Sequence, residues 1–310
     1  MSNELIIELE SFDTGELYRI HGPGHGDRGV FLGQHPEGIY DEPTESIWNS
    51  HAFQIGASFG GIRIHKRDVI LGMEITDTPD ATWQDNDSDW RLAWDYKKDS
   101  KLWIETNDSR RWLSLKMSED PKFAPDTDPF QAQYGHIIYT AVAGNPRWYE
   151  KDYTDQWINS TDTTNGAWAP DGFVKAWNPT NTTAWMIWTV QAYPGAVYKL
   201  PDFSFGNDKE ERAVEDAARK IVMPALIAGE HLVVNTDDED DQVTSNIDTQ
   251  VWQRMEGVTF CYPLEPYFGT GRHRTYEEPV NLPVTVKNAP AGVGVQLRIR
   301  RGFTRPWGLR

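Results

Sequence analysis

The stretch AGEHLVVNTDDEDDQVTSN, residues 228–246, contains the pattern that decides the fold of this chain. It begins with an apolar run at 231–234 that is rich in valine and leucine and therefore predicts a β-strand. Five consecutive acidic residues follow at 237–241. This acidic run has three interpretations: a calcium-binding loop, part of an active site, or the polar turn between two strands.

The acidic run does not match a calcium loop. A helix-loop-helix calcium site needs acidic residues at positions 1, 3 and 5 and glycine at position 6, where the chain turns sharply. Counting from Asp237, the sixth position is Gln242; in a second acidic run, 85–89, the same position is Trp90. We therefore interpret both runs as solvated polar loops.

Composition indicates a soluble globular protein. The chain has 310 residues, of which 38% are hydrophobic and 25% charged, and its formal net charge is −17. This acidity argues against a nucleic-acid-binding protein, because phosphate contacts require dense Lys and Arg. No apolar run reaches the roughly 20 residues that span a bilayer, and the N-terminus does not have the pattern of a secretory signal. The only cysteine, Cys261, cannot form an internal disulfide, and its apolar neighbours predict a small buried side chain.

Strand patterns dominate the chain. We predict three hairpins: one around Gly60 and Gly61, one formed by 101–106 and 111–116, and one formed by 173–177 and 185–190. Further strands are predicted at 69–75, 258–262, 284–287 and 294–300. A helix is predicted at 207–224, where Val214, Ala217, Ala218 and Ile221 would share one face. The expected fold is predominantly β, in sandwiches or barrels.

Prolines and acidic residues interrupt the strand pattern at 118–131. Such a segment is typical of a domain boundary. We therefore predict one domain at 1–130 and a second at 131–310.

The sequence shows no catalytic signature: it contains no G-x-S-x-G motif, no P-loop and no H-E-x-x-H motif. The histidines of 21–27 lie in a glycine-rich segment that predicts a surface turn. Five tryptophans that lie within strand patterns predict core positions and cross-strand pairs: Trp103, Trp112, Trp177, Trp185 and Trp188. Three others, Trp148, Trp157 and Trp168, lie in turn-rich segments, where a sugar-binding platform stays open. We predict no catalytic, cofactor-binding or metal-binding residue.

Several motifs in a fixed order resemble the distal tail protein family of long-tailed bacteriophages, in particular the minor tail proteins of phages that infect actinobacteria. In the second half they are FVKAWNPTNTTAWMIWTVQ (173–191), YKLPDFSF (198–205), VWQRMEGVTFCYPLEPY (251–267) and LPVTVKNAPAGVGVQLRIRRGFTRPWG (282–308). In the first half GVFLG, GIYDEP, WNSHAFQIGASFGG, RDVILGMEI and SRRWLSLKMSEDPKF also fit. The resemblance covers nearly the whole chain, and its motifs are structural.

The resemblance implies an N-terminal belt domain of β-hairpins and sheets that forms a six-fold ring, and a C-terminal galectin-like β-sandwich with one short helix. Such a protein is a hub at the distal end of the virion tail, made in the host cytoplasm. Its expected partners are the tail tube, the tape measure protein, the tail-associated baseplate protein and receptor-binding components. It would have no enzymatic activity and no cofactor. A negatively charged ring would let DNA pass without binding it.

In this family the stretch at 228–246 corresponds to a sandwich strand that enters a polar loop, so we interpret the acidic run as a turn. We also expect self-association through the N-terminal half, because the hairpin at 53–64 would expose strand edges. The alternative is a carbohydrate-binding module or a glycosidase that acts on the host cell envelope.

Basic residues gather near the C-terminus, where 279–310 contains no Asp or Glu. They are Lys287, Arg298, Arg300, Arg301, Arg305 and Arg310. In the strand at 294–300, alternation places Leu297 and Ile299 on one face and Arg298 and Arg300 on the other. We expect these arginines to pair with carboxylates, either of the same chain or of a neighbouring subunit, and to set the orientation of the chain against an acidic partner. The alternative is that they form a solvated face.

Overall fold

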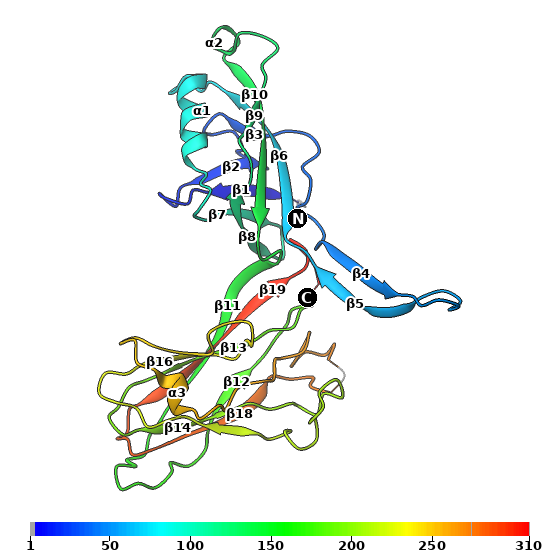
Figure 1. Ribbon diagram of the computed structural model, residues 1–310. Helices are drawn as coiled ribbons and strands as arrows, with labels where there is room; N and C mark the ends of the chain where they lie inside the picture. Colours follow the sequence, from blue (N-terminus) through cyan, green and yellow to red (C-terminus); the bar gives the residue numbers. More distant parts are fainter. Residues whose placement is uncertain (1–3, 274, 310) are drawn as a thin grey trace. The chain divides into compact units, whose positions relative to one another are not determined.

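The computed structural model describes residues 4–273 and 275–309 (Figure 1). The chain forms two compact units, the first comprising Met1–Glu150 with Phe303–Leu309, and the second Lys151–Gly302. It leaves the first unit within strand β11 (Trp148–Ile158) and returns within β19 (Gly294–Phe303).

The two units differ from the predicted ranges 1–130 and 131–310. Strand β10 (Tyr134–Ala143) lies beyond the predicted boundary but pairs with β6 (Arg67–Thr76) along its whole length. The proline-rich segment is therefore a connection within the first unit. It contains β9 (Lys122–Phe123) and the short helix α2 (Pro129–Ala132).

The first unit is built from antiparallel strands. One set has the order β2 (Leu17–His21), β1 (Ile6–Glu10), β7 (Ser100–Glu105) and β8 (Arg110–Met117). The other has β3 (Val30–Leu32), β6, β10 and β9. The end of β8 also pairs with β10. Alternate residues of β6, β7, β8 and β10 are buried, and they form one apolar core with buried residues of β1 and β2. The predicted strand at 69–75 and the predicted hairpin of 101–106 with 111–116 are confirmed.

Two buried arginines attach the C-terminal segment to the first unit. Arg67 donates to the carbonyls of Pro146 at 2.9 Å, Gly38 at 2.9 Å and Thr304 at 3.2 Å, and its burial lowers its pKa to about 10. Arg111 pairs with the Glu150 carboxylate. The other nitrogens of Arg111 donate to the carbonyls of Arg305 at 2.8 Å and Gly308 at 2.7 Å. These bonds pair buried guanidinium groups with backbone carbonyls of the C-terminal segment and of neighbouring loops.

Helix α1 (Trp83–Leu92) replaces the polar loop predicted at 85–89. Thr82 and Asp85 form a capping box: the Thr82 hydroxyl accepts from the Asp85 N–H at 3.3 Å, and the Asp85 carboxylate accepts from the Thr82 N–H at 3.1 Å. Trp83 and Trp90 are buried on the inner side of the helix. The acidic residues of this run therefore belong to the cap and the solvent-facing side of a helix.

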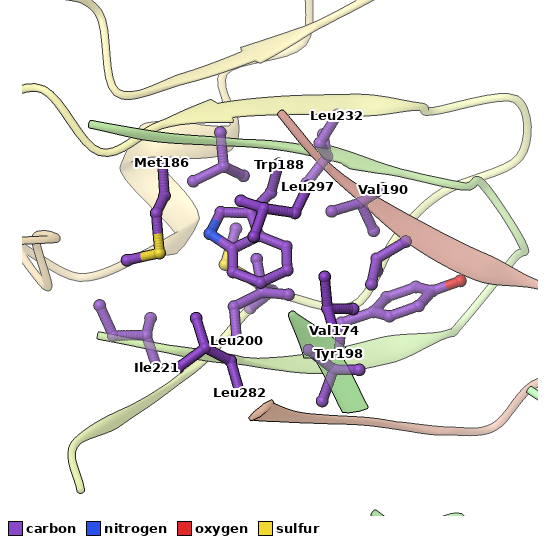
Figure 2. Packing of buried hydrophobic residues seen from close by; sticks show 14 of the residues in the cluster. Val174, Met186, Trp188, Val190, Tyr198, Leu200, Ile221, Leu232, Leu282 and Leu297 are labelled. Carbon is purple, nitrogen blue, oxygen red and sulfur yellow. The ribbon is translucent and has the colours of Figure 1, made fainter. Parts of the chain in front are cut away.

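The second unit is a β-sandwich. One sheet has the order β17 (Val243–Ser245), β16 (Leu232–Asn235), β13 (Met186–Val190), β19 and β11. The other has β12 (Gly172–Ala176), β18 (Val280–Lys287), β14 (Val197–Pro201) and β15 (Lys220–Val222). Helix α3 (Val251–Arg254) is short. Figure 2 shows side chains of both sheets packed around Trp188, which is fully buried. The chain is mostly β, as predicted.

The strands predicted at 173–177 and 185–190 exist, but they do not form a hairpin. β12 pairs with β18, whereas β13 pairs with β16 and β19 in the opposite sheet. The connection therefore crosses the sandwich. The buried Asn178 stabilises this crossing, because its amide donates to the carbonyls of Thr182 at 2.8 Å and Glu265 at 2.9 Å.

The helix predicted at 207–224 is absent from the described residues, which form successive turns ending in β15. Val214, assigned to its apolar face, is 84% exposed. Ile221 instead pairs with Leu200 in the sheet and is buried. The Ser204 hydroxyl also donates a hydrogen bond to the Ala213 carbonyl at 2.6 Å. Strand pairing of the last residues outweighs the weak helical periodicity.

The segment predicted as a strand at 258–262 has no strand partner among the described residues. Side chains bind its backbone instead: Gln242 both donates to and accepts from Phe260, and Asp202 accepts from the N–H groups of Cys261 and Tyr262. Cys261 is exposed, contrary to the expected buried side chain. Its thiol sulfur lies 3.3 Å from an Arg219 nitrogen.

Candidate assembly surfaces

A two-stranded arm in the first unit carries a cluster of exposed apolar side chains. It consists of β4 (Thr44–Asn49) and β5 (Ser58–Ile64), which pair only with each other (Figure 1). Gly60 and Gly61 lie inside β5, so the turn is not where the glycines predicted it. The chain reverses instead at residues 50–57, where Phe53 and Gly56 have positive φ.

Both faces of the arm carry exposed apolar side chains. Phe53 and Ile55 at the tip are fully exposed, and Trp48 and Phe59 are each 61% exposed. The rings of Trp48 and Phe59 contact each other, with centroids 5.6 Å apart. Three further exposed residues are Ile47, Ile62 and Ile64. Contiguous exposed apolar side chains of this kind are typical of a protein-protein interface.

The acidic run at 237–241 is the turn between β16 and β17, as interpreted from the sequence. Its hydrogen bonds are local: the Asp240 carboxylate accepts from the Asn235 amide, and the Asp237 carboxylate from the Glu239 N–H. In residues 4–273 and 275–309, no group of three or more His, Cys, Asp or Glu is placed to hold a metal ion.

The basic residues near the C-terminus do not form one row. Lys287 lies in β18 of the opposite sheet, and Arg305 lies in the first unit, where it pairs with Asp41 at 3.0 Å. Arg310 lies outside the described residues. The alternation in β19 is confirmed, with Leu297 and Ile299 buried and Arg298 and Arg300 on the other face.

The arginines of β19 face a carboxylate of their own chain. The Arg298 guanidinium lies 3.8 Å from the Asp152 carboxylate, and Arg301 donates to the Lys151 carbonyl at 2.6 Å. Burial raises the pKa of Asp152, and the neighbouring arginines oppose this rise. Part of the expected pairing is therefore internal to the second unit.

The tryptophans considered for a sugar platform lie in different environments. Trp148 is fully buried in the first unit and donates to the Ile39 carbonyl, so it cannot contact a sugar. Trp157 packs against the core of the second unit. The Trp168 ring has the ammonium groups of Lys199 and Lys287 at 4.0 and 5.0 Å from its centroid.

Of the five tryptophans predicted to lie in the core or in cross-strand pairs, three do so. Trp188 is a core residue. Trp103 and Trp112 form the predicted cross-strand pair, with centroids 5.1 Å apart. Trp177 contacts Tyr153, and Trp185 is half-buried.

None of the helices formed by the described residues is long and apolar enough to cross a membrane.

No protein-family model matches the chain. The chain is 29% identical to the minor tail protein Gp27 of Mycobacterium phage D29 and 28% identical to the minor tail protein Gp27 of Mycobacterium phage L5, in both cases over the full length of both proteins. Its fold is similar to that of the Dit protein (gp 19.1) of phage SPP1, described as a paradigm of hub adsorption apparatus in phages that infect Gram-positive bacteria. The TM-score is 0.56 at 9% identity, over 96% of this chain and 99% of that protein.

These comparisons agree with the resemblance found in the sequence motifs. The relation to the Gp27 proteins extends over the full length of the chain, and the fold is that of a Dit protein. Sequence and fold thus point the same way: the chain is similar throughout its length to minor tail proteins of mycobacteriophages, and it has a Dit-like fold.

Proposed function

We propose that this protein is the ring-shaped hub at the distal end of the tail, assembled from six copies. The first unit would correspond to the belt and the second to the galectin-like domain. Full-length similarity to minor tail proteins and the Dit-like fold support a tail-tip role. The exposed apolar arm is the observation that supports self-association.

The arm requires a partner on physical grounds. An isolated two-stranded hairpin is at best marginally stable in water. Here both strands are exposed along their length, and the tip residues Phe53 and Ile55 are fully exposed. Packing the arm onto the next copy would remove this surface from water. A head-to-tail contact of this kind generates a ring when its rotation closes.

The other proposed partners follow from the hub role. They are the tail tube, the tape measure protein, the tail-associated baseplate protein and receptor-binding components. The net charge of −17 suits a ring that DNA traverses without being held. We propose that the protein has no enzymatic activity and that it is synthesised in the host cytoplasm. Release of sugars from host cell-wall polysaccharide by the purified protein would instead support the glycosidase alternative.

Light scattering coupled to size-exclusion chromatography tests the ring. The full chain at increasing concentration should reach six times its 35.4 kDa mass. The variant Phe53→Ser/Ile55→Ser should remain monomeric with an unchanged circular dichroism spectrum. A matched control is Leu92→Ser, which removes an apolar side chain that is 72% exposed at the end of α1 and outside the arm. Assembly of the arm variant with wild-type affinity would exclude the arm as the interface.

A further inference from the structure

The edge strand β17 in the second unit has backbone groups that face away from its sheet. β17 pairs on one side with β16 and is the last strand of the sheet. The Asn235 N–H donates to the Gln242 carbonyl, and the Asn246 N–H donates to the His231 carbonyl. Antiparallel pairing alternates, so these bonds direct the even-numbered residues toward β16 and Val243 and Ser245 away from it.

Val243 is the residue for which this matters. It is only 9% exposed, yet its N–H and C=O point away from β16, where no strand pairs with them among the described residues. The outward carbonyl of Ser245 already accepts from the Asp248 N–H at 3.2 Å. An edge strand presents unpaired backbone groups with which another strand can pair. The edge at Val243 is therefore suited to an added strand.

A groove of about 800 Å³ lies along this edge. Its floor includes Val243, Val251 and Phe260, which belong to the core of the second unit. Trp252, which follows Val251 in α3 and also lines the groove, is 42% exposed. The groove thus combines an apolar floor, an exposed aromatic ring and a free strand edge.

The rim of the groove is acidic. Asp238, Asp240, Asp241 and Asp248 line it, and all four are exposed. None of them forms an ion pair within residues 4–273 and 275–309, and only Asp240 accepts a hydrogen bond from another side chain, that of Asn235. Unpaired carboxylates beside an exposed indole favour a ligand with guanidinium or ammonium groups.

We propose that this groove binds an extended peptide segment of another protein that carries Arg or Lys at alternate positions. The peptide would pair with the Val243 edge as an added strand. Its basic side chains would lay their aliphatic stems on the apolar floor, with their charged ends against Trp252 and the aspartates. In strand addition the backbone bonds supply affinity and the alternate side chains supply specificity. This site is separate from the arm and does not depend on ring formation.

Fluorescence anisotropy with labelled synthetic peptides tests the proposal on the full chain. The probe is a peptide of alternating Arg and Thr. Two comparison peptides separate the contributions: alternating Glu and Thr reverses the charge, and the Arg-Thr peptide methylated on alternate backbone nitrogens removes the strand bonds. Each comparison peptide should bind at least about tenfold more weakly, the equivalent of roughly one charge-assisted hydrogen bond. Equal binding of either would overturn the proposal.

Variants locate the binding site. Asp241→Asn/Asp248→Asn and Trp252→Ala should each weaken the Arg-Thr peptide by about tenfold or more. The matched control is Glu211→Gln/Glu215→Gln, which removes the same number of charges from exposed positions that do not line the groove. A control variant that lost as much affinity would reduce the effect to net charge. Displacement of the peptide by micromolar calcium chloride would identify a cation site and refute the peptide site.

Discussion

Replacing Arg111 by methionine should destabilise the first unit strongly. The Arg111 side chain is fully buried, and its partner Glu150 is 3% exposed, with 3.0 Å between their nitrogen and oxygen. Methionine fills similar volume but donates nothing. It leaves a buried carboxylate without its counter-charge and removes donors from the carbonyls of Arg305 and Gly308.

The magnitude follows from the burial of this pair. Removing one partner of a buried ion pair costs about 3–5 kcal/mol, because the remaining charge stays desolvated. For a unit of this size, that lowers the melting temperature by about 10 °C. Arg110→Met is the matched control. Its side chain is 46% exposed, with Glu8 and Glu105 at 3.3 Å. Glu105 is also exposed, and the buried Glu8 keeps Arg19 as a counter-charge at 3.0 Å, so the expected loss is only about 0–1 kcal/mol.

Urea unfolding of the two variants and of the double variant Arg111→Met/Glu150→Gln measures these effects. The double variant should be more stable than Arg111→Met alone, because the uncompensated charge is gone. If Arg111→Met costs no more than Arg110→Met, or if adding Glu150→Gln lowers stability further, the buried carboxylate does not determine the loss.

Two further predictions concern the second unit. Burial raises the pKa of Asp202 despite hydrogen bonds from Cys261 and Tyr262 and the nearby Arg219 charge, so the folded state holds this proton more tightly than the unfolded state. The wild type should therefore lose stability relative to Asp202→Asn as the pH rises from the ordinary Asp pKa through the raised pKa. Urea unfolding of both proteins between about pH 3 and 6 measures this. A free-energy advantage of the wild type that stayed constant or grew with pH would contradict the prediction. Arg298→Glu/Arg300→Glu should weaken tail-tip assembly while leaving the subunit folded, and normal assembly at both low and high salt would make these arginines a solvated face.

Alternating strands could be predicted from the sequence because burial on one face leaves a period-two pattern. β6, β7, β8 and β19 follow this pattern. The pairing of β12 and β13 could not be predicted in this way. β12 alternates and β13 is buried at four of its five positions, but neither pattern identifies a partner. The partners are set by the buried Asn178 network and by strands more than 40 residues away.

The helix predictions were wrong at two places: the helix at 83–92 was not predicted, and the one predicted at 207–224 is absent from the described residues. The sequence at α1 contains the capping pair Thr82 and Asp85 and the apolar Trp90, a pattern that predicts a helix start followed by a buried face. The acidic residues between them also fit a polar loop, which is why a loop was predicted. The periodicity near Val214 was misleading because Ile221 pairs as a strand. The exposed arm could be anticipated from its apolar residues. The groove could not, because it depends on which residues of β17 direct their backbone groups away from β16.

The two proposed contacts differ in physical origin, and salt should separate them. The arm offers apolar rings with few charges, and apolar association is not weakened by moderate salt. The groove offers exposed aspartates, whose attraction for a basic peptide is screened within about 8 Å at physiological ionic strength. Raising the sodium chloride concentration should therefore release the Arg-Thr peptide while the assembled form persists. Parallel loss of both would show that charge, and not the apolar arm, holds the copies together.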